Sequence, residues 1–179
     1  WQKAVALHKF AGDTKKNMFS NYLARTAIRW TKNPKPLKSA GSTCKTKPSY
    51  VVVVDVDGVM TNGKILITSE GEMYREMDTR DGYALKHALN KGFNIGVISG
   101  GTNEGVRKRL ELLGVNKIYL GIEKKEIAFN DFVQTLNIDP KEVLYMGDDV
   151  ADIAVMEKVG VATCPQDAVS DVKKIVDYV

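Results

Sequence analysis

Two carboxylates follow a run of four valines in the stretch VVVVDVDG, residues 51–58. Valine is β-branched and favours extended structure, and an unbroken apolar run is typical of a strand buried on both faces. Asp55 and Asp57 therefore come where a buried strand ends, on the same side of the chain because side chains alternate along a strand. Charge at the tip of a buried strand needs a compensating partner.

Other polar groups follow further strand-like runs. Ser99 ends FNIGVIS, Lys125 lies just after KIYLG, and Asp148 and Asp149 follow VLYMG. Two carboxylates about 4 Å apart repel by roughly 4 kcal/mol at an effective dielectric constant near 20. A divalent cation with oxygen ligands removes that cost, and Mg²⁺ typically binds through a few carboxylates plus a substrate phosphate. Ser99 and Lys125 suit the phosphate oxygens, so the pattern predicts a magnesium and phosphoryl site.

The elements that position these groups alternate between strand and helix patterns. The expected strands begin at 51, 93, 117, 143, 161 and 175, and the helices cover 82–92, a segment around Val106 and Leu110, 124–136 and 152–160. Residues 64–68 and 72–77 read as a small β-hairpin flap after the first strand. The alternation predicts an α/β, Rossmann-like parallel sheet with helices on both faces and no large cap domain. The carboxyl ends of parallel strands share one edge, where the polar groups should converge.

Charge divides the chain into two parts. Residues 1–49 hold eleven Lys or Arg and a single acid, Asp13, whereas residues 50–179 hold 15 basic and 21 acidic residues, giving net charges of +10 and −6. We therefore expect a basic N-terminal extension over 1–49 and a folded domain over 50–179.

The basic extension allows three interpretations. Its stretch NYLARTAIRW, residues 21–30, could form a basic amphipathic helix of the kind found in mitochondrial presequences. It could instead be a solubilising tail, or a segment that docks onto an acidic protein surface or RNA. The last interpretation makes the chain a subunit or assembly factor of a mitochondrial ribonucleoprotein, such as the mitoribosome, or of another larger assembly.

Composition also limits location. Cys44 and Cys164 are 120 positions apart, which gives no disulfide framework and favours a reducing compartment. No run of 18 apolar residues occurs, so no membrane span is expected. The expected location is mitochondrial, because of the extension, and otherwise cytoplasmic.

The motifs together resemble a known family. DVDG, a Ser at the end of the second main strand, a downstream Lys and GDDVAD match, in order, the four motifs of haloacid-dehalogenase-superfamily phosphatases. DVDGVMTNGKI, MDTRDGYALK, GIEKKEIAF and YMGDDVADIAVMEKVG narrow the resemblance to the capless subgroup that contains 3-deoxy-D-manno-octulosonate 8-phosphate phosphatase. The resemblance covers residues 50–179.

The resemblance implies roles for the acidic residues. Asp55 would be the nucleophile that forms an aspartyl-phosphate, and Asp57 would protonate the leaving alcohol and later activate water. Mg²⁺ would be held by Asp55, by the backbone carbonyl of Asp57 and by Asp148. Asp149 and Asp152 would support these ligands. The implied function is a Mg²⁺-dependent phosphomonoesterase for a small phosphorylated metabolite, with a phosphorylated sugar acid as the candidate substrate.

The resemblance also implies substrate-binding residues. Ser99, Gly100 and Lys125 would hold the phosphoryl group, with Lys124 as a solvated neighbour. Arg80, in TRDG, matches a substrate-side motif, although an exposed ion pair that opens a helix is an alternative for it.

Two features depart from the subgroup. Gly101 stands where the subgroup often has an Arg, which removes a bidentate anion contact. The subgroup also continues into a Gly-rich tail, whereas this sequence stops at Val179. The sequence therefore leaves open both the substrate specificity and the tetramer that is common in the subgroup.

Overall fold

The computed structural model describes residues 51–179, which lie in the second of the chain's two units, residues 50–179. Their main feature is a five-stranded sheet with the order β5-β4-β1-β6-β7, and every neighbouring pair is parallel. The strands are β1 (Val51–Val54), β4 (Asn94–Ile98), β5 (Lys117–Tyr119), β6 (Val143–Met146) and β7 (Val161–Thr163). The predicted α/β parallel sheet is confirmed.

The four valines form the central strand. Val51 pairs with Asn94 of β4 on one side and with Val143 of β6 on the other, and this register continues along the strand. No valine of β1 is more than 2% exposed. A strand covered on both faces needs apolar side chains at every position, which explains the unbroken run.

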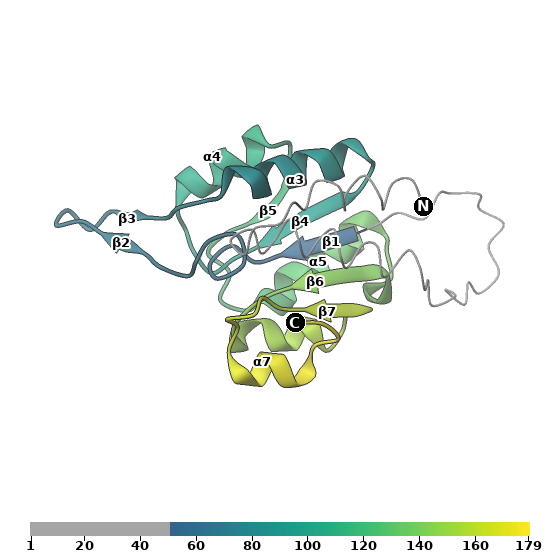
Figure 1. Ribbon diagram of the computed structural model, residues 1–179. Coiled ribbons are helices and arrows are strands. Elements are labelled where there is room, and N and C mark those ends of the chain that lie inside the picture. The colour runs from purple at the N-terminus through teal and green to yellow at the C-terminus, as the bar shows by residue number, and fades with distance from the viewer. Residues whose placement is uncertain (1–50) are drawn as a thin grey trace, which may run out of the picture. The chain divides into compact units, whose positions relative to one another are not determined.

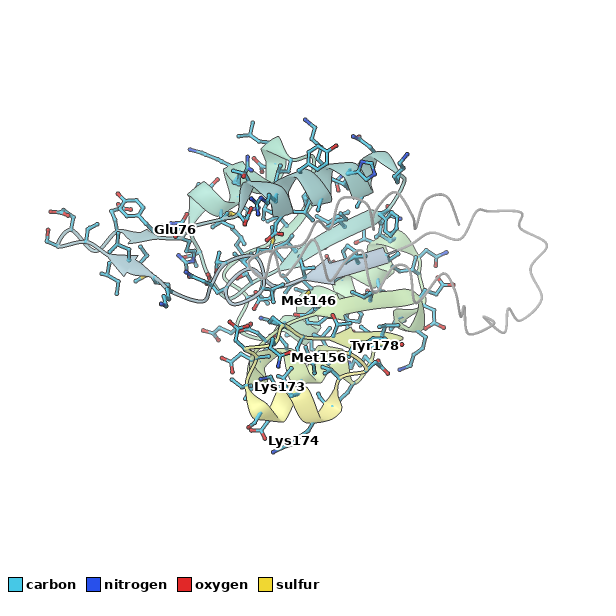
Figure 2. All side chains as sticks on the ribbon, in the orientation of Figure 1. Glu76, Met146, Met156, Lys173, Lys174 and Tyr178 are labelled. Atoms are coloured by element: carbon cyan, nitrogen blue, oxygen red, sulfur yellow. The ribbon has the colours of Figure 1, made fainter. Side chains whose placement is uncertain are left out.

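Helices cover both faces of the sheet (Figure 1). On one face lie α3 (Thr79–Asn90) and α4 (Glu104–Leu112); on the other lie α5 (Lys125–Leu136), α6 (Ile153–Met156) and α7 (Ser170–Ile175). Phe129 and Phe132 of α5 are fully buried against β1 and β6. Met146 and Met156, labelled in Figure 2, are also buried, as expected for apolar filler. Among the described residues, no helix has the length and apolar character needed to cross a membrane.

The predicted hairpin is present between the first strand and α3. It consists of β2 (Leu66–Ile67) and β3 (Met73–Tyr74), paired antiparallel, and it extends away from the sheet (Figure 1). All four residues are exposed, by 47–68%. We refer to residues 66–74 as the hairpin. Glu76, labelled in Figure 2, lies where the chain returns from it to the body.

The C-terminal part differs from the prediction. Residues 175–179 were expected to form a strand, but Ile175 ends helix α7 and only an isolated bridge joins Tyr178 to Thr163. The predicted strand is wrong, because only residues 177 and 178 of this segment pair with the edge strand β7. The helix expected over 152–160 is shorter, since the 3₁₀ helix η2 (Val150–Asp152) precedes a four-residue α6.

Candidate active site

The predicted nucleophile lies at the carboxyl end of the central strand. The backbone N–H of Asp55 continues the ladder by donating to the carbonyl oxygen of Met146 at 3.0 Å. Its side chain is 7% exposed, with Oδ1 accepting from the Val56 N–H at 2.6 Å. Oδ2 accepts from Nζ of Lys125 at 2.5 Å. A buried carboxylate in this position is therefore paired with a buried ammonium group.

Lys125 reaches this position from the first residue of α5. Its Nζ also donates to Oδ1 of Asp152 at 2.7 Å, so one ammonium joins two carboxylates. Its side chain is only 5% exposed, whereas Lys124 is exposed. Of the two neighbouring lysines, the structure thus brings Lys125 to the site, as predicted.

Asp152 is fully buried and holds several parts of the site together. Its Oδ1 also accepts from the hydroxyl of Tyr145 at 2.6 Å. Its Oδ2 accepts from the backbone N–H groups of Asp148 and Asp149 at 3.1 and 3.2 Å. Because both oxygens are occupied, Asp152 is suited to support its neighbours, which agrees with the role implied for it. Tyr145 was missed, although a buried tyrosine hydroxyl normally has a hydrogen-bond partner.

Asp148 completes the acidic group. One carboxylate oxygen from each of Asp55, Asp148 and Asp152 can be chosen so that all three lie within 4.8 Å of one another. Gly58 makes room for Asp148, since a Cβ at that position would lie 1.9 Å from Oδ2 of Asp148, and φ at Gly58 is +80°. We refer to Asp55, Lys125, Asp148 and Asp152 as the charge cluster.

The electrostatics of the charge cluster favour a cation. Burial raises the pKa of Asp55 to about 6, with the charge of Asp152 adding to the rise and that of Lys125 opposing it. Burial and the charges of Asp55 and Asp152 raise the pKa of Asp148 to about 7. Burial alone would lower the pKa of Lys125, but the two adjacent carboxylates raise it above its usual value. Clustered oxygen donors with excess negative charge fit a hard divalent ion such as Mg²⁺.

Asp57 lies beside the charge cluster but has a different partner. Its Oδ1 accepts from Nε of Arg75 at 2.8 Å and its Oδ2 from Nη2 at 3.0 Å, which makes a bidentate ion pair. Asp57 is 30% exposed at its side chain, far more than Asp55. Arg75 follows the hairpin and was missed, because nothing in the sequence distinguishes it from a solvated arginine.

The predicted phosphate-binding residues follow β4. Ser99 is 2% exposed, and its Oγ accepts from the Gly101 N–H at 3.3 Å. Gly100 is exposed beside it. Arg80 is exposed near the start of α3, where its N–H donates to the capping carboxylate of Asp78. Ser99 and Gly100 are thus at the expected sheet edge, and Arg80 lies on the helix that follows the hairpin.

Asp149 has a capping role. It is exposed, and its carboxylate caps η2 by accepting from the Val150 N–H at 2.7 Å. It orders the loop that carries Asp148, which is an indirect form of the support expected of it.

Comparison with known proteins identifies the family. Residues 71–160 match the model of haloacid dehalogenase-like hydrolases. The 3-deoxy-D-manno-octulosonate 8-phosphate phosphatase of Escherichia coli K12 is 37% identical over 130 residues, which are 73% of this chain and 69% of that protein. The chain belongs to the haloacid dehalogenase-like hydrolases.

Solved structures of this hydrolase family agree. The 3-deoxy-D-manno-octulosonate 8-phosphate phosphatase of Yersinia pestis superposes with a TM-score of 0.71 at 30% identity, covering 73% of this chain and 71% of that one. The Moraxella catarrhalis enzyme, solved with magnesium, phosphate and KDO, gives 0.70 at 26% identity, covering 74% and 76%. This hydrolase is a phosphatase, and its cofactor is Mg²⁺, which the charge cluster fits. The extension, its partners and the compartment stay predictions, because residues 1–49 lie outside the described part.

Proposed function

We propose that the chain hydrolyses phosphorylated sugar acids, with 3-deoxy-D-manno-octulosonate 8-phosphate as the candidate substrate, through an aspartyl-phosphate on Asp55. The observation that carries the mechanism is the arrangement of Asp55, buried at a strand end and bonded to Lys125. The substrate class is supported by the Escherichia coli K12 relative, which is 37% identical over 130 residues, or 73% of this chain.

In the first step, a carboxylate oxygen of Asp55 attacks phosphorus while the bond to the leaving oxygen breaks. Asp57, two residues on, enters this step protonated, with one of its oxygens released from the pair with Arg75, and gives its proton to the leaving oxygen. In the second step, Asp57 removes a proton from water, which attacks the phosphorus and releases inorganic phosphate from Asp55.

The remaining groups hold charge in place. Lys125 keeps Asp55 oriented and offers a positive charge to the phosphoryl oxygens, and Ser99 offers its hydroxyl. Asp55, Asp148 and the backbone carbonyl of Asp57 would hold Mg²⁺. When bound, the ion neutralises the carboxylates and polarises the phosphoryl group.

The test is turnover by the full chain of 3-deoxy-D-manno-octulosonate 8-phosphate, glucose 6-phosphate and p-nitrophenyl phosphate, with Mg²⁺ and with EDTA. We expect Mg²⁺-dependent hydrolysis with the highest kcat/KM for the sugar acid. Asp55→Asn should reduce kcat on the order of 10³-fold or more, because the amide cannot act as the nucleophile.

Asp139→Asn is the matched control. Asp139 is an exposed residue whose side chain caps η1 (Pro140–Glu142) by accepting from the Lys141 N–H, which an Asn oxygen can also do. Full activity in Asp55→Asn would rule out this nucleophile. Equal kcat/KM values for the sugar acid and for glucose 6-phosphate would rule out the substrate class.

A further inference from the structure

The ion pair between Arg75 and Asp57 joins the root of the hairpin to the active site. The two residues are 18 positions apart, and the guanidinium side chain is 7% exposed. The hydrogen bonds from Arg75 to Asp57 raise the pKa of the guanidinium further, so it stays charged. The hairpin itself is exposed (Figure 1), so its buried contact with the site lies at its base.

A second contact fixes the backbone beside Arg75. The side-chain amide of Asn103 donates to the carbonyl oxygen of Met73 at 2.8 Å, while its Oδ1 caps α4 by accepting from the Val106 N–H at 3.1 Å. The loop after β4, which carries Ser99, is thus bonded to β3. Arg75 therefore has a defined place relative to the phosphate-binding loop.

Gly101 leaves the space that the guanidinium occupies. A Cβ at position 101 would lie 3.1 Å from Nη2 of Arg75 and 3.3 Å from Oδ2 of Asp57. Both distances are tighter than nine in ten real Cβ contacts, so the neighbouring atoms would have to move by a few tenths of an ångström. A side chain at position 101 would therefore push on the ion pair, and the glycine leaves space for Arg75, which directly follows the hairpin.

The guanidinium group of Arg75 has more N–H donors than its hydrogen-bond partners occupy. Arg75 donates through Nε and Nη2 to Asp57, and through Nη1 to the carbonyl oxygen of Met73 at 3.5 Å. One N–H on Nη1 and one on Nη2 have no acceptor within residues 51–179. A guanidinium with free donors beside a phosphoryl site is suited to bind an anionic oxygen.

We propose that Arg75 is a specificity-determining residue, which orients Asp57 with one set of donors and binds an anionic oxygen of the substrate with the others. This inference rests on the proposed function. The oxygen belongs either to the phosphoryl group or to a second acidic group on the leaving alcohol. Arg75 thereby supplies, from the segment that follows the hairpin, the positive charge for which Gly101 leaves space.

The experiment uses the full chain with Mg²⁺ and the variants Arg75→Gln and Arg75→Lys. Arg107→Gln is the matched control, because Arg107 of α4 pairs with Glu104 at 3.4 Å, donates to the carbonyl oxygen of Ile118 at 3.4 Å, and is not part of the site. KM and kcat are measured for 3-deoxy-D-manno-octulosonate 8-phosphate, glucose 6-phosphate and p-nitrophenyl phosphate. Calorimetric titration with inorganic phosphate gives a reading that needs no turnover.

Loss of charge-assisted hydrogen bonds should weaken binding about tenfold or more in Arg75→Gln, and less in Arg75→Lys, which keeps the charge. A weaker phosphate affinity and a higher KM for all three esters assign the phosphoryl group as the anion. A higher KM for the sugar acid alone, with phosphate affinity unchanged, assigns its carboxylate. Either pattern supports Arg75 as a substrate contact, provided that Arg107→Gln matches the wild type.

Unchanged KM values and phosphate affinity in Arg75→Gln overturn the inference, even if kcat falls, because Arg75 would then only orient Asp57. Gly101→Ala sharpens the test. Its Cβ presses on the guanidinium, so it should shift the same constants in the same direction, and its effect should largely vanish when combined with Arg75→Gln. If the wild type hydrolyses none of the esters, the proposed function fails, while the phosphate titration still tests Arg75.

Discussion

The charge cluster and the hairpin are two regions of one site with opposite physical character. In the charge cluster, Asp55, Lys125 and Asp152 are at most 7% exposed, and each is bonded to another member. In the hairpin, all four paired residues are exposed, and its strands have two residues each. The comparison teaches that the nucleophile and its cation lie in the core, whereas the residue proposed for specificity, Arg75, directly follows an exposed hairpin.

The largest expected effect comes from breaking the charge cluster. Lys125→Met removes the ammonium group that bonds both Asp55 and Asp152 and leaves these two buried carboxylates without it. We expect the free energy of unfolding to fall by about 3–5 kcal/mol, as for other broken buried pairs, and activity to be lost. Urea unfolding at neutral pH measures the change.

Lys124→Met is the control, because Lys124 is the exposed neighbour at the start of the same helix. It should alter the free energy of unfolding by less than about 0.5 kcal/mol. Similar losses in both variants would contradict the distinction between the two lysines.

Alanine substitutions at two glycines, one in each region, compare the two regions directly. Gly58, at the charge cluster, and Gly71, in the hairpin, have φ values of +80° and +83°, so alanine is strained at both. Only at Gly58 would the new Cβ meet a neighbour, Oδ2 of Asp148 at 1.9 Å, whereas Gly71 has nothing within 4 Å. Gly58→Ala should therefore weaken Mg²⁺ binding about tenfold or more, since Asp148 must move.

Gly71→Ala should cost about 1 kcal/mol of backbone strain and leave Mg²⁺ affinity unchanged. Isothermal titration with Mg²⁺ and thermal unfolding separate the two effects. If both variants lose affinity equally, the close approach of Gly58 to Asp148 does not control the metal site.

The smallest expected effect is the pH dependence of the charge cluster. In the metal-free protein the pKa values of Asp55 and Asp148 are raised to about 6 and about 7 from 3.8, so the folded state holds these protons more tightly. Proton binding by these two carboxyl groups contributes fully to the free energy of unfolding below about pH 4, and this contribution is lost as the pH rises through 6 and 7. Mg²⁺ needs the ionised forms, so its stabilising effect should grow over the same range.

Thermal unfolding with EDTA and with Mg²⁺, at several values from about pH 5 to about pH 8, measures this difference. The increase in Tm caused by Mg²⁺ should be larger at the upper end. Asp148→Asn should flatten the dependence because it removes one of the two titrating groups. An increase that is constant with pH in the wild type would contradict the raised pKa values.

The charge cluster could be predicted from the sequence because each member follows a recognisable element. Asp55 and Asp148 come after apolar runs that can only be buried strands, and parallel strands end at one edge. The choice of Lys125 needed the family motif, since two adjacent lysines have the same local pattern. Fold and cluster thus follow from strand periodicity together with motif order.

The hairpin contacts could not be predicted in the same way. Arg75 lies outside the helices and strands of the structure. Its pairing with Asp57 depends on the course of the loop that follows the hairpin, which no sequence periodicity predicts. Tyr145 lies in a strand whose residues are all buried, so the pattern did not indicate that its hydroxyl bonds Asp152. The prediction of a strand over residues 175–179 was wrong because apolar residues near 175 fit the end of a helix as well as an edge strand.

The contacts of Lys125 have a consequence for how the chain folds. Its ammonium group bonds residues 70 positions earlier and 27 positions later in the chain, so neither bond can form until distant segments have docked. Long-range contacts of this kind close large loops, and the chain entropy that this costs must be spent before the contacts form. We therefore expect the active site to be among the last parts to assemble, so that partly folded chains expose the acidic residues before their cation arrives.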